Sequence, residues 1–210
     1  MSVTTLLAIS LGAILTNNFI FAQFLGICPF LGVSKKIDTA VGMGAAVTFV
    51  MGLASAFCYL INMVLVSLHL EFMQTVAYIL VIAGLVQFVE MFLKKNIPTL
   101  YTALGVYLPL ITTNCCVLAV TILVVDDYGA DVAALGFGAA YIEALICAVG
   151  AGVGFMLAMV MFSGVRKRVE ACDPPASFKG LPITLLAAAI TSLSFMGFGG
   201  IVENLFNVTL

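Results

Sequence analysis

Six long apolar segments, separated by short polar breaks, constrain this chain more than any other feature of its sequence. The segments cover residues 3–33, 39–70, 72–93, 97–125, 132–165 and 181–202. Each is long enough for a helix to cross a bilayer, which takes about 20 mostly apolar residues. With 63% hydrophobic and 9% charged residues, the chain has too little polar surface for a water-soluble globule. The sequence therefore predicts an all-α integral membrane protein with six transmembrane helices.

The basic residues are distributed among the breaks in a pattern that predicts the topology. All eight lie in the first, third or fifth break: Lys35, Lys36, Lys94, Lys95, Arg166, Lys167, Arg168 and Lys179. Lys and Arg concentrate in the cytoplasmic loops of membrane proteins. We therefore expect these three breaks in the cytoplasm and both termini on the outer side. The basic residues form no patch of the kind that binds nucleic acid.

The lengths of the segments predict an internal repeat. The order long, long, short occurs twice, which divides the single membrane domain into halves of about residues 1–96 and 97–210. The second segment opens with "DTAVGMGAA" and the fifth with "DVAALGFGAA". Three spans are an odd number, so the second half is inverted relative to the first. Inverted repeats place their functional sites near the midplane, at interrupted helices in the two halves.

Polar clusters beside a proline mark the first and fourth segments as the interrupted helices. The clustered residues are Thr16, Asn17 and Asn18 in the first segment and Thr112, Thr113 and Asn114 in the fourth. Proline disrupts a helix, and Asn and Thr side chains can satisfy the backbone groups that a break releases. Two other roles also fit these side chains: hydrogen bonds to a neighbouring helix, and oxygen ligands for a transient Na⁺.

Two cysteines accompany these clusters. Cys28 and Cys115 come from segments that enter the membrane from opposite faces, so an inverted pair would bring them together near the middle. Two thiolates are half of the ligand set of a 2Fe–2S cluster, and a second subunit would supply the others. Buried cysteine also serves simply as a small apolar residue. The only histidine, His69, lies at the outer edge of the second segment and does not complete a ligand set.

Two acids near or within the apolar segments have more than one interpretation. Glu143 lies inside the fifth segment, and an intramembrane carboxylate is a functional hypothesis by default. An ion or proton site fits Glu143, as do a protonated acid paired with a neighbour and a residue in a wet outer cavity. Glu90 lies one turn before Lys94, where an ion pair along the helix is the simpler interpretation.

These features leave two function classes open. One is a subunit that carries electrons on a metal centre, and the other is a secondary transporter of a small solute, because inverted repeats and interrupted helices fit both. The sequence contains no nucleophile–histidine pair, phosphate loop or nucleotide fingerprint, so the chain has no complete active site of its own. Iron content and colour would discriminate between the two classes.

Several motifs are closely similar to those of the RnfA/NqrE family. The longest are "NNFIFAQFLGICPFLGVSKK" and "LGVYLPLITTNCCVLAV", and "VQFVEMFLKK", "LGFGAA", "DPPASFKGLPI" and "SLSFMGFGG" also match. The resemblance extends over nearly the whole chain, to about Gly200. The pair Asn17 and Asn18 and the step from Cys28 to Pro29 look more like the RnfA branch of the family.

The resemblance implies a subunit of a redox-driven ion pump in the prokaryotic cytoplasmic, or inner, membrane. The Rnf type of pump is a ferredoxin:NAD oxidoreductase that translocates Na⁺ or H⁺. In such complexes the subunit pairs with an RnfE-like subunit of opposite topology. The pair holds an intramembrane 2Fe–2S cluster to which each chain gives two cysteines. Flavin and the other iron–sulfur centres belong to other subunits.

Carried onto this sequence, the resemblance makes Cys28 and Cys115 the cluster ligands. The family usually has one cysteine after the asparagine, whereas here Cys116 follows Cys115 directly and is the alternative ligand. Neighbouring positions of a helix point about 100° apart, so the two thiols would not bind the same iron. The remaining cysteines match no ligand position. Cys58 and Cys147 are predicted to pack in the membrane, and Cys172 is predicted to be a free thiol in the fifth break.

Overall fold

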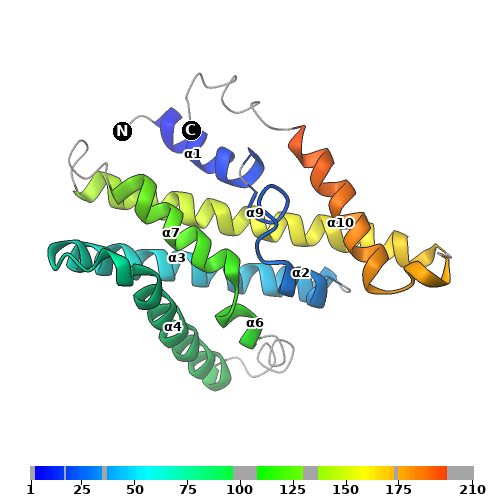
Figure 1. Cartoon of the computed structure of the whole chain (residues 1–210), viewed down its shortest axis with the longest axis horizontal. Helices are drawn as coiled ribbons and strands as arrows, with labels where there is room; N and C mark the ends of the chain where they lie inside the picture. Colours follow the sequence, from blue (N-terminus) through cyan, green and yellow to red (C-terminus); the bar gives the residue numbers. More distant parts are fainter. Residues whose placement is uncertain are drawn as a thin grey trace.

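The structure, a computed structural model, describes residues 3–16, 18–34, 37–96, 108–129, 137–172 and 175–197. All regular secondary structure in these ranges is helical (Figure 1), which confirms the predicted all-α class for them. The longer helices are α3 (Ile37–Ser67), α4 (Gln74–Asn96), α7 (Cys115–Gly129), α9 (Phe137–Ala171) and α10 (Leu181–Met196). The shorter elements are α1 (Val3–Leu11), the π-helix η1 (Gly12–Thr16), α2 (Ile27–Val33), α6 (Leu108–Thr112) and the 3-10 helices η2 (Glu71–Met73) and η3 (Ala176–Phe178).

Four stretches of the described chain are long and apolar enough to cross a membrane. They are Ile37–Ser67, Gln74–Phe92, Pro109–Tyr128 and Phe137–Ala171. Two shorter apolar helices, Leu6–Leu15 and Leu181–Met196, lie in the first and last of the predicted segments. These helices confirm a multi-pass membrane protein, while the count of six spans and the division into two repeats stay predictions.

The antiparallel pair α3 and α9 forms the centre of the molecule (Figure 1). The two helices approach closely because glycine faces a larger residue at two levels. A Cβ added to Gly44 would lie 2.5 Å from Cγ of Met156, and one added to Gly152 would lie 2.7 Å from Cα of Thr48. Small residues allow such close packing between membrane helices. The two contacts are reciprocal, with one glycine on each helix.

The first and fourth segments are both interrupted, as the polar clusters predict. In the first segment η1 ends at Thr16 and α2 begins at Ile27, and residues 18–26 form irregular turns between them. In the fourth segment α6 ends at Thr112 and α7 begins at Cys115. In Figure 1 the turns before α2 lie across the middle of α9, beside the break between α6 and α7.

Three helices extend past the predicted ends of their apolar segments, because charged residues end the apolar part of a helix without ending the helix. α4 continues through Lys94 and Lys95 to Asn96, and α7 continues beyond Val125 to Gly129. α9 continues through Arg166 to Ala171. Lys and Arg are good helix formers and interact favourably with the carboxyl end of a helix.

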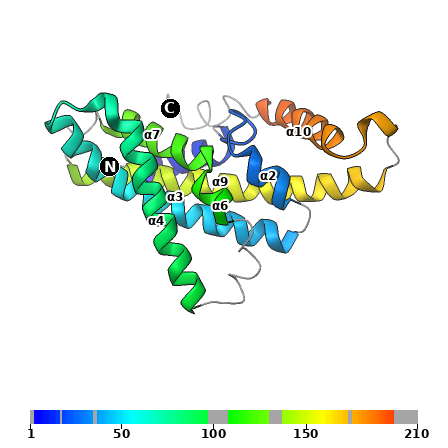
Figure 2. The same cartoon turned by 60° about the horizontal axis from the view of Figure 1, so that its bottom comes forward.

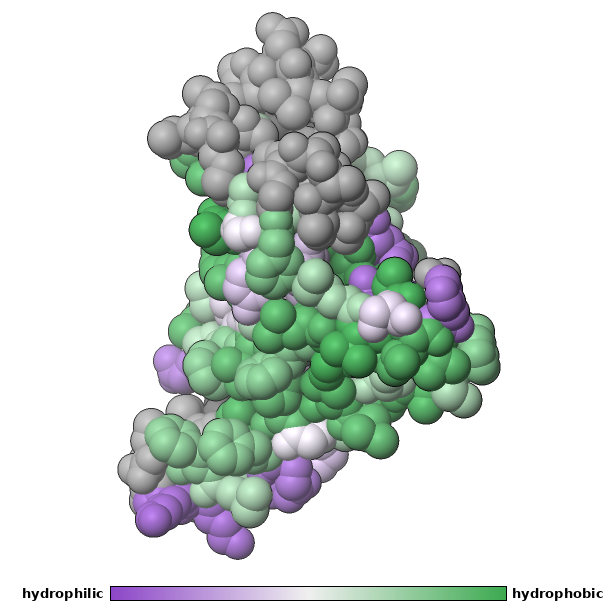
Figure 3. Space-filling view, turned by 90° about the vertical axis from the view of Figure 1, so that its left-hand side faces the viewer, coloured by the Kyte–Doolittle hydropathy of each residue, from purple (hydrophilic) through white to green (hydrophobic). Residues whose placement is uncertain are grey.

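The outer helices expose many apolar side chains. α4 extends away from the α3–α9 pair in both Figure 1 and Figure 2, and α10 lies along another edge. Phe88 of α4 is 62% exposed and Leu193 of α10 is 68% exposed. Apolar residues also cover the middle of the face in Figure 3, with hydrophilic residues toward its edges. Such surfaces suit contact with lipid or with other membrane subunits.

Candidate functional site

The two helix breaks meet at Gly26 and Cys115, which are 89 residues apart in the sequence. The backbone N–H of Gly26 donates a hydrogen bond to the Cys115 sulfur, with an N-to-S distance of 3.0 Å. Gly26 has a φ of +79°, and a Cβ at this position would lie 2.8 Å from Cε2 of Phe155 and 3.1 Å from Cβ of Cys116. Only glycine combines this left-handed conformation with so close an approach.

Asn18 satisfies the backbone groups of the first break. Its amide nitrogen donates to the carbonyl oxygen of Ile14 at 3.2 Å and to that of Gly154 on α9 at 2.9 Å. Its side-chain oxygen accepts from the backbone N–H of Ile20 at 3.1 Å and of Phe21 at 3.4 Å. With 1% of its surface exposed, Asn18 has no access to water for these bonds. The predicted helix-repair role is therefore confirmed for Asn18, which also ties the break to α9.

Asn114 caps the helix that begins after the second break. Its side-chain oxygen accepts from the backbone N–H of Cys116 at 3.0 Å, which satisfies one of the free donors at the start of α7. Its amide nitrogen is buried and has no hydrogen-bond partner in the described part of the chain. A buried donor without an acceptor costs about 1–3 kcal/mol. This orphaned donor lies in the residue directly before Cys115.

The other predicted oxygen ligands are distributed around the breaks. The hydroxyl of Thr113 donates to the Pro109 carbonyl at 2.9 Å, so it repairs the end of α6. Thr112 is the last residue of α6 and Thr16 the last residue of η1. Asn17 lies outside the described residues. An ion-binding role for this group stays a prediction.

The three cysteines at the breaks differ in exposure. Cys28 and Cys115 are exposed on the surface of the chain, whereas Cys116 is fully buried in the apolar core. Cys58 and Cys147 are also buried among apolar residues, as predicted for packing residues. No three side chains of His, Cys, Asp or Glu gather into a metal site within the residues that the structure describes. The chain thus presents two accessible thiols on adjoining breaks.

Arg166 of α9 anchors the helix that carries Cys28, a role that no pattern in the sequence indicates. Its guanidinium donates to the carbonyl oxygen of Leu31 at 2.5 Å and to the hydroxyl of Ser34 at 2.8 Å, both at the carboxyl end of α2. It also forms an ion pair with Glu170 at 3.0 Å. The i,i+4 spacing of Arg166 and Glu170 is visible in the sequence, but their contact with α2 is not.

Aromatic stacking completes the anchoring of α2. The ring of Phe30 stacks on that of Phe162 on α9, with a centroid distance of 4.2 Å. Phe21, in the turns before α2, contacts Phe30 edge to face and stacks on Phe195 of α10. The hydroxyl of Ser192 on α10 donates to the Phe21 carbonyl. The position of Cys28 therefore depends on both α9 and α10.

Glu143 lies apart from the breaks. It is buried on α9, 11 residues before Gly154, which contacts Asn18. At 1.5 Å per residue, the two positions are about 16 Å apart along the helix. The structure therefore does not join Glu143 with the other predicted site residues.

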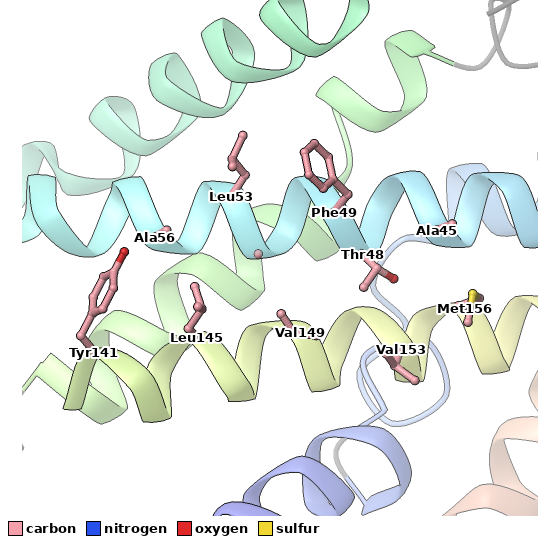
Figure 4. Close-up of a pocket in the computed structure, with 11 residues that line it drawn as sticks. Ala45, Thr48, Phe49, Leu53, Ala56, Tyr141, Leu145, Val149, Val153 and Met156 are labelled. Carbon is pink, nitrogen blue, oxygen red and sulfur yellow. The ribbon is translucent and has the colours of Figure 1, made fainter. Parts of the chain in front are cut away.

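An apolar groove runs along the α3–α9 pair (Figure 4). Phe49, Leu145, Val149 and Val153 contribute much of its lining. The hydroxyl of Thr48, also in the lining, is bonded to the Gly44 carbonyl at 2.8 Å. Such a groove suits an acyl chain or an apolar side chain, and its side chains offer little to bind a polar solute.

The chain is similar to known membrane proteins over most of its length. Residues 6–202 match the family model described as "Rnf-Nqr subunit, membrane protein". The chain is 50% identical over 198 residues to the A subunit of the ion-translocating oxidoreductase complex of Syntrophotalea carbinolica, covering 94% of this chain and 97% of that protein. It is also 50% identical over 198 residues to the A subunit of the Na⁺-translocating ferredoxin:NAD⁺ oxidoreductase complex of Acetobacterium woodii, covering 93% and 97% of the two chains.

A relative from Vibrio vulnificus shows the same extent of similarity. It is the A subunit of an ion-translocating oxidoreductase complex, 46% identical over 201 residues that cover 95% of this chain and 100% of the relative. All three alignments extend over nearly the full length of both chains. They therefore include both helix breaks, α9 and α10.

Proposed function

Since this chain belongs to the Rnf-Nqr family of membrane subunits, we propose that it is the A subunit of an ion-translocating ferredoxin:NAD⁺ oxidoreductase complex. Its role in the complex is to hold, together with a homologous subunit of opposite topology, a 2Fe–2S cluster inside the membrane. The observation that carries this role is the contact between the two cysteine-bearing breaks, through Gly26 and Cys115.

The chemistry of the breaks fits half of a cluster site. Such a cluster takes four thiolates, and Cys28 and Cys115 are the two thiols that the breaks expose. The N–H of Gly26 points at the Cys115 sulfur, and hydrogen bonds of this kind stabilise a thiolate. The orphaned amide of Asn114 is a further donor beside the site. Cys116 faces the core and is not a ligand in this proposal.

The chain's own residues position the two thiols. Asn18 and Asn114 hold the two breaks in shape, and Arg166 and Phe162 fix α2 against α9. When bound, the cluster supplies a one-electron carrier partway through the membrane. An additional negative charge in a low-dielectric site interacts strongly with nearby cations and helices. Such an interaction would couple electron flow to the movement of Na⁺ or H⁺.

The orientation of the site in the membrane follows from the topology that the basic residues predict. The breaks at residues 34–38, 94–96 and 166–180 face the cytoplasm, and both termini lie on the outer side of the cytoplasmic membrane. Subunits that carry flavin and further iron–sulfur centres donate and accept the electrons. The similarity to the Na⁺-translocating relative favours Na⁺ as the coupling ion.

The test is the iron content and the reduced-state EPR spectrum of the intact purified complex. We expect Cys28→Ala and Cys115→Ala each to remove one 2Fe–2S signal while the other subunits remain assembled. The matched control is Cys116→Ala, which changes the neighbouring buried thiol and should retain the signal. If Cys116→Ala alone removes the signal, the ligand is Cys116. If no variant changes iron or spectrum, a secondary transporter becomes the better function.

A further inference from the structure

Glu143 is the one buried carboxyl group among the acids whose side chains the structure describes. Only 6% of its surface is exposed. The other acids with described side chains are exposed or half-buried: Asp38, Glu90, Asp126, Asp127 and Glu170. Glu143 makes no hydrogen bond or ion pair with any residue that the structure describes. No residue that the structure describes therefore stabilises a negative charge on Glu143 through a hydrogen bond or an ion pair.

The ionisable side chains found near Glu143 in the described part of the chain carry no positive charge. Cys147 lies one turn after Glu143 on α9, and the side chain of Tyr128, on α7, is close enough to Cys147 to interact with it electrostatically. Glu143 and Asp127 are both close enough to this phenol to interact with it electrostatically. The hydroxyl of Tyr59, on α3, donates to the Tyr128 carbonyl at 3.2 Å. Every group named here is neutral or acidic, so none neutralises the carboxylate.

A carboxylate in so buried a position is costly when its charge has no counter-ion, which makes it a candidate site for a cation. The position of Glu143 suits such a site. Arg166 lies 23 residues further along α9, and at 1.5 Å per residue the two are about 35 Å apart, close to the thickness of a bilayer's hydrocarbon core. Glu143 thus lies near one membrane surface when Arg166 lies near the other.

We propose that Glu143 is a binding site for the translocated monovalent cation, at the end of the molecule where α7 ends and α9 begins. This inference rests on the proposed function, and the topology proposed above places the site on the outer side. The ligand chemistry is a buried carboxylate with the phenol of Tyr128 nearby, which serves H⁺ or Na⁺. The cation leaves or enters the membrane here, away from the cysteine-bearing breaks.

Labelling of the intact complex with a hydrophobic carbodiimide tests the proposal, because this reagent modifies protonated carboxyl groups that are shielded from water. We expect mass spectrometry to find the label on Glu143 and not on the exposed Asp126. Protection by Na⁺ and not by K⁺ would identify a Na⁺ site. Labelling that depends on pH and not on Na⁺ would identify a proton site. Absence of label on Glu143 would overturn the proposal.

Two variants extend the test to transport. Glu143→Gln should lose ion uptake into vesicles and carbodiimide labelling together, and Glu143→Asp should retain both in part. Asp38→Asn is the matched control, since Asp38 is an exposed acid that takes no part in the helix breaks or in the anchoring of α2. Full ion uptake in Glu143→Gln would overturn the inference. The EPR signal of the cluster should persist in all three variants, so its absence from the wild type would instead refute the proposed function.

Discussion

At the scale of single residues, the site depends on a few side chains that satisfy the backbone where the helices break. Asn18 makes four hydrogen bonds and leaves no side-chain donor or acceptor atom without a partner. Asn114 makes one through its oxygen and leaves its amide nitrogen without an acceptor in the described part of the chain. Buried donors are rarely left unsatisfied in folded proteins. In the proposed complex, a sulfur of the cluster or a group of the partner subunit would be the acceptor for this amide.

Gly26 provides the residue-scale prediction. Gly26→Ala places an alanine in the left-handed backbone conformation and brings its Cβ against Phe155. Together these two effects lower the stability of the fold by about 2–5 kcal/mol. We expect the complex to denature at a lower temperature and to lose iron, because the two breaks no longer fit together. Gly32→Ala is the control on α2, where the added Cβ would meet only Leu110, at 3.9 Å. Equal stability of both variants would show that the contact at Gly26 is not required.

At the scale of elements, the structure makes α9 the support of the first broken segment. Gly154 binds Asn18, Phe155 packs on Gly26, and Phe162 and Arg166 hold α2. These contacts follow one another along the helix toward its carboxyl end. A rigid helix of 35 residues can therefore set the position of Cys28 relative to Cys115.

Arg166 provides the element-scale prediction. Arg166→Gln leaves the carboxyl end of α2 without its cation, and each hydrogen bond lost from a charged group costs about 1.5–3 kcal/mol. We expect α2 to loosen and the redox midpoint of the 2Fe–2S EPR signal to shift. Arg166→Lys should restore part of the wild-type value. The exposed Arg168 supplies the control Arg168→Gln, and an equal shift in that variant would argue for a general effect of charge.

The interruptions were predictable because their causes are local. A proline, an adjacent Thr/Asn cluster and a glycine are visible in the sequence and act on their own backbone. The contacts that complete the site are not local. Arg166 bonds Leu31 across 135 residues, and Gly26 bonds Cys115 across 89. Such pairs depend on which helices pack together, and charge patterns alone carry no information on that choice.

At the scale of the whole molecule, composition and length were sufficient to predict a multi-pass helical membrane protein. Helix ends were less predictable, since α9 continues well past its last apolar residues to Ala171. The exposed apolar faces of α4 and α10 show that the chain is covered by lipid or by other subunits. A membrane protein with this much exposed apolar surface is consistent with function inside a larger complex.

The orientation of the molecule provides the last prediction. Cys172 is exposed just beyond α9, in the break that the positive-inside rule places in the cytoplasm. A membrane-impermeant maleimide should therefore label Cys172 in inverted vesicles and leave it unlabelled in intact cells, with Cys172→Ser identifying the labelled peptide. Asp126→Cys, near the end of α7, should show the opposite pattern. Because α9 joins these two ends of the molecule, labelling of both positions from one side would contradict a membrane-spanning α9. Reversed labelling would show that the whole chain has the opposite orientation in the membrane. Only the predicted pattern places Glu143 at the outer surface, where the cation site proposed for it would open.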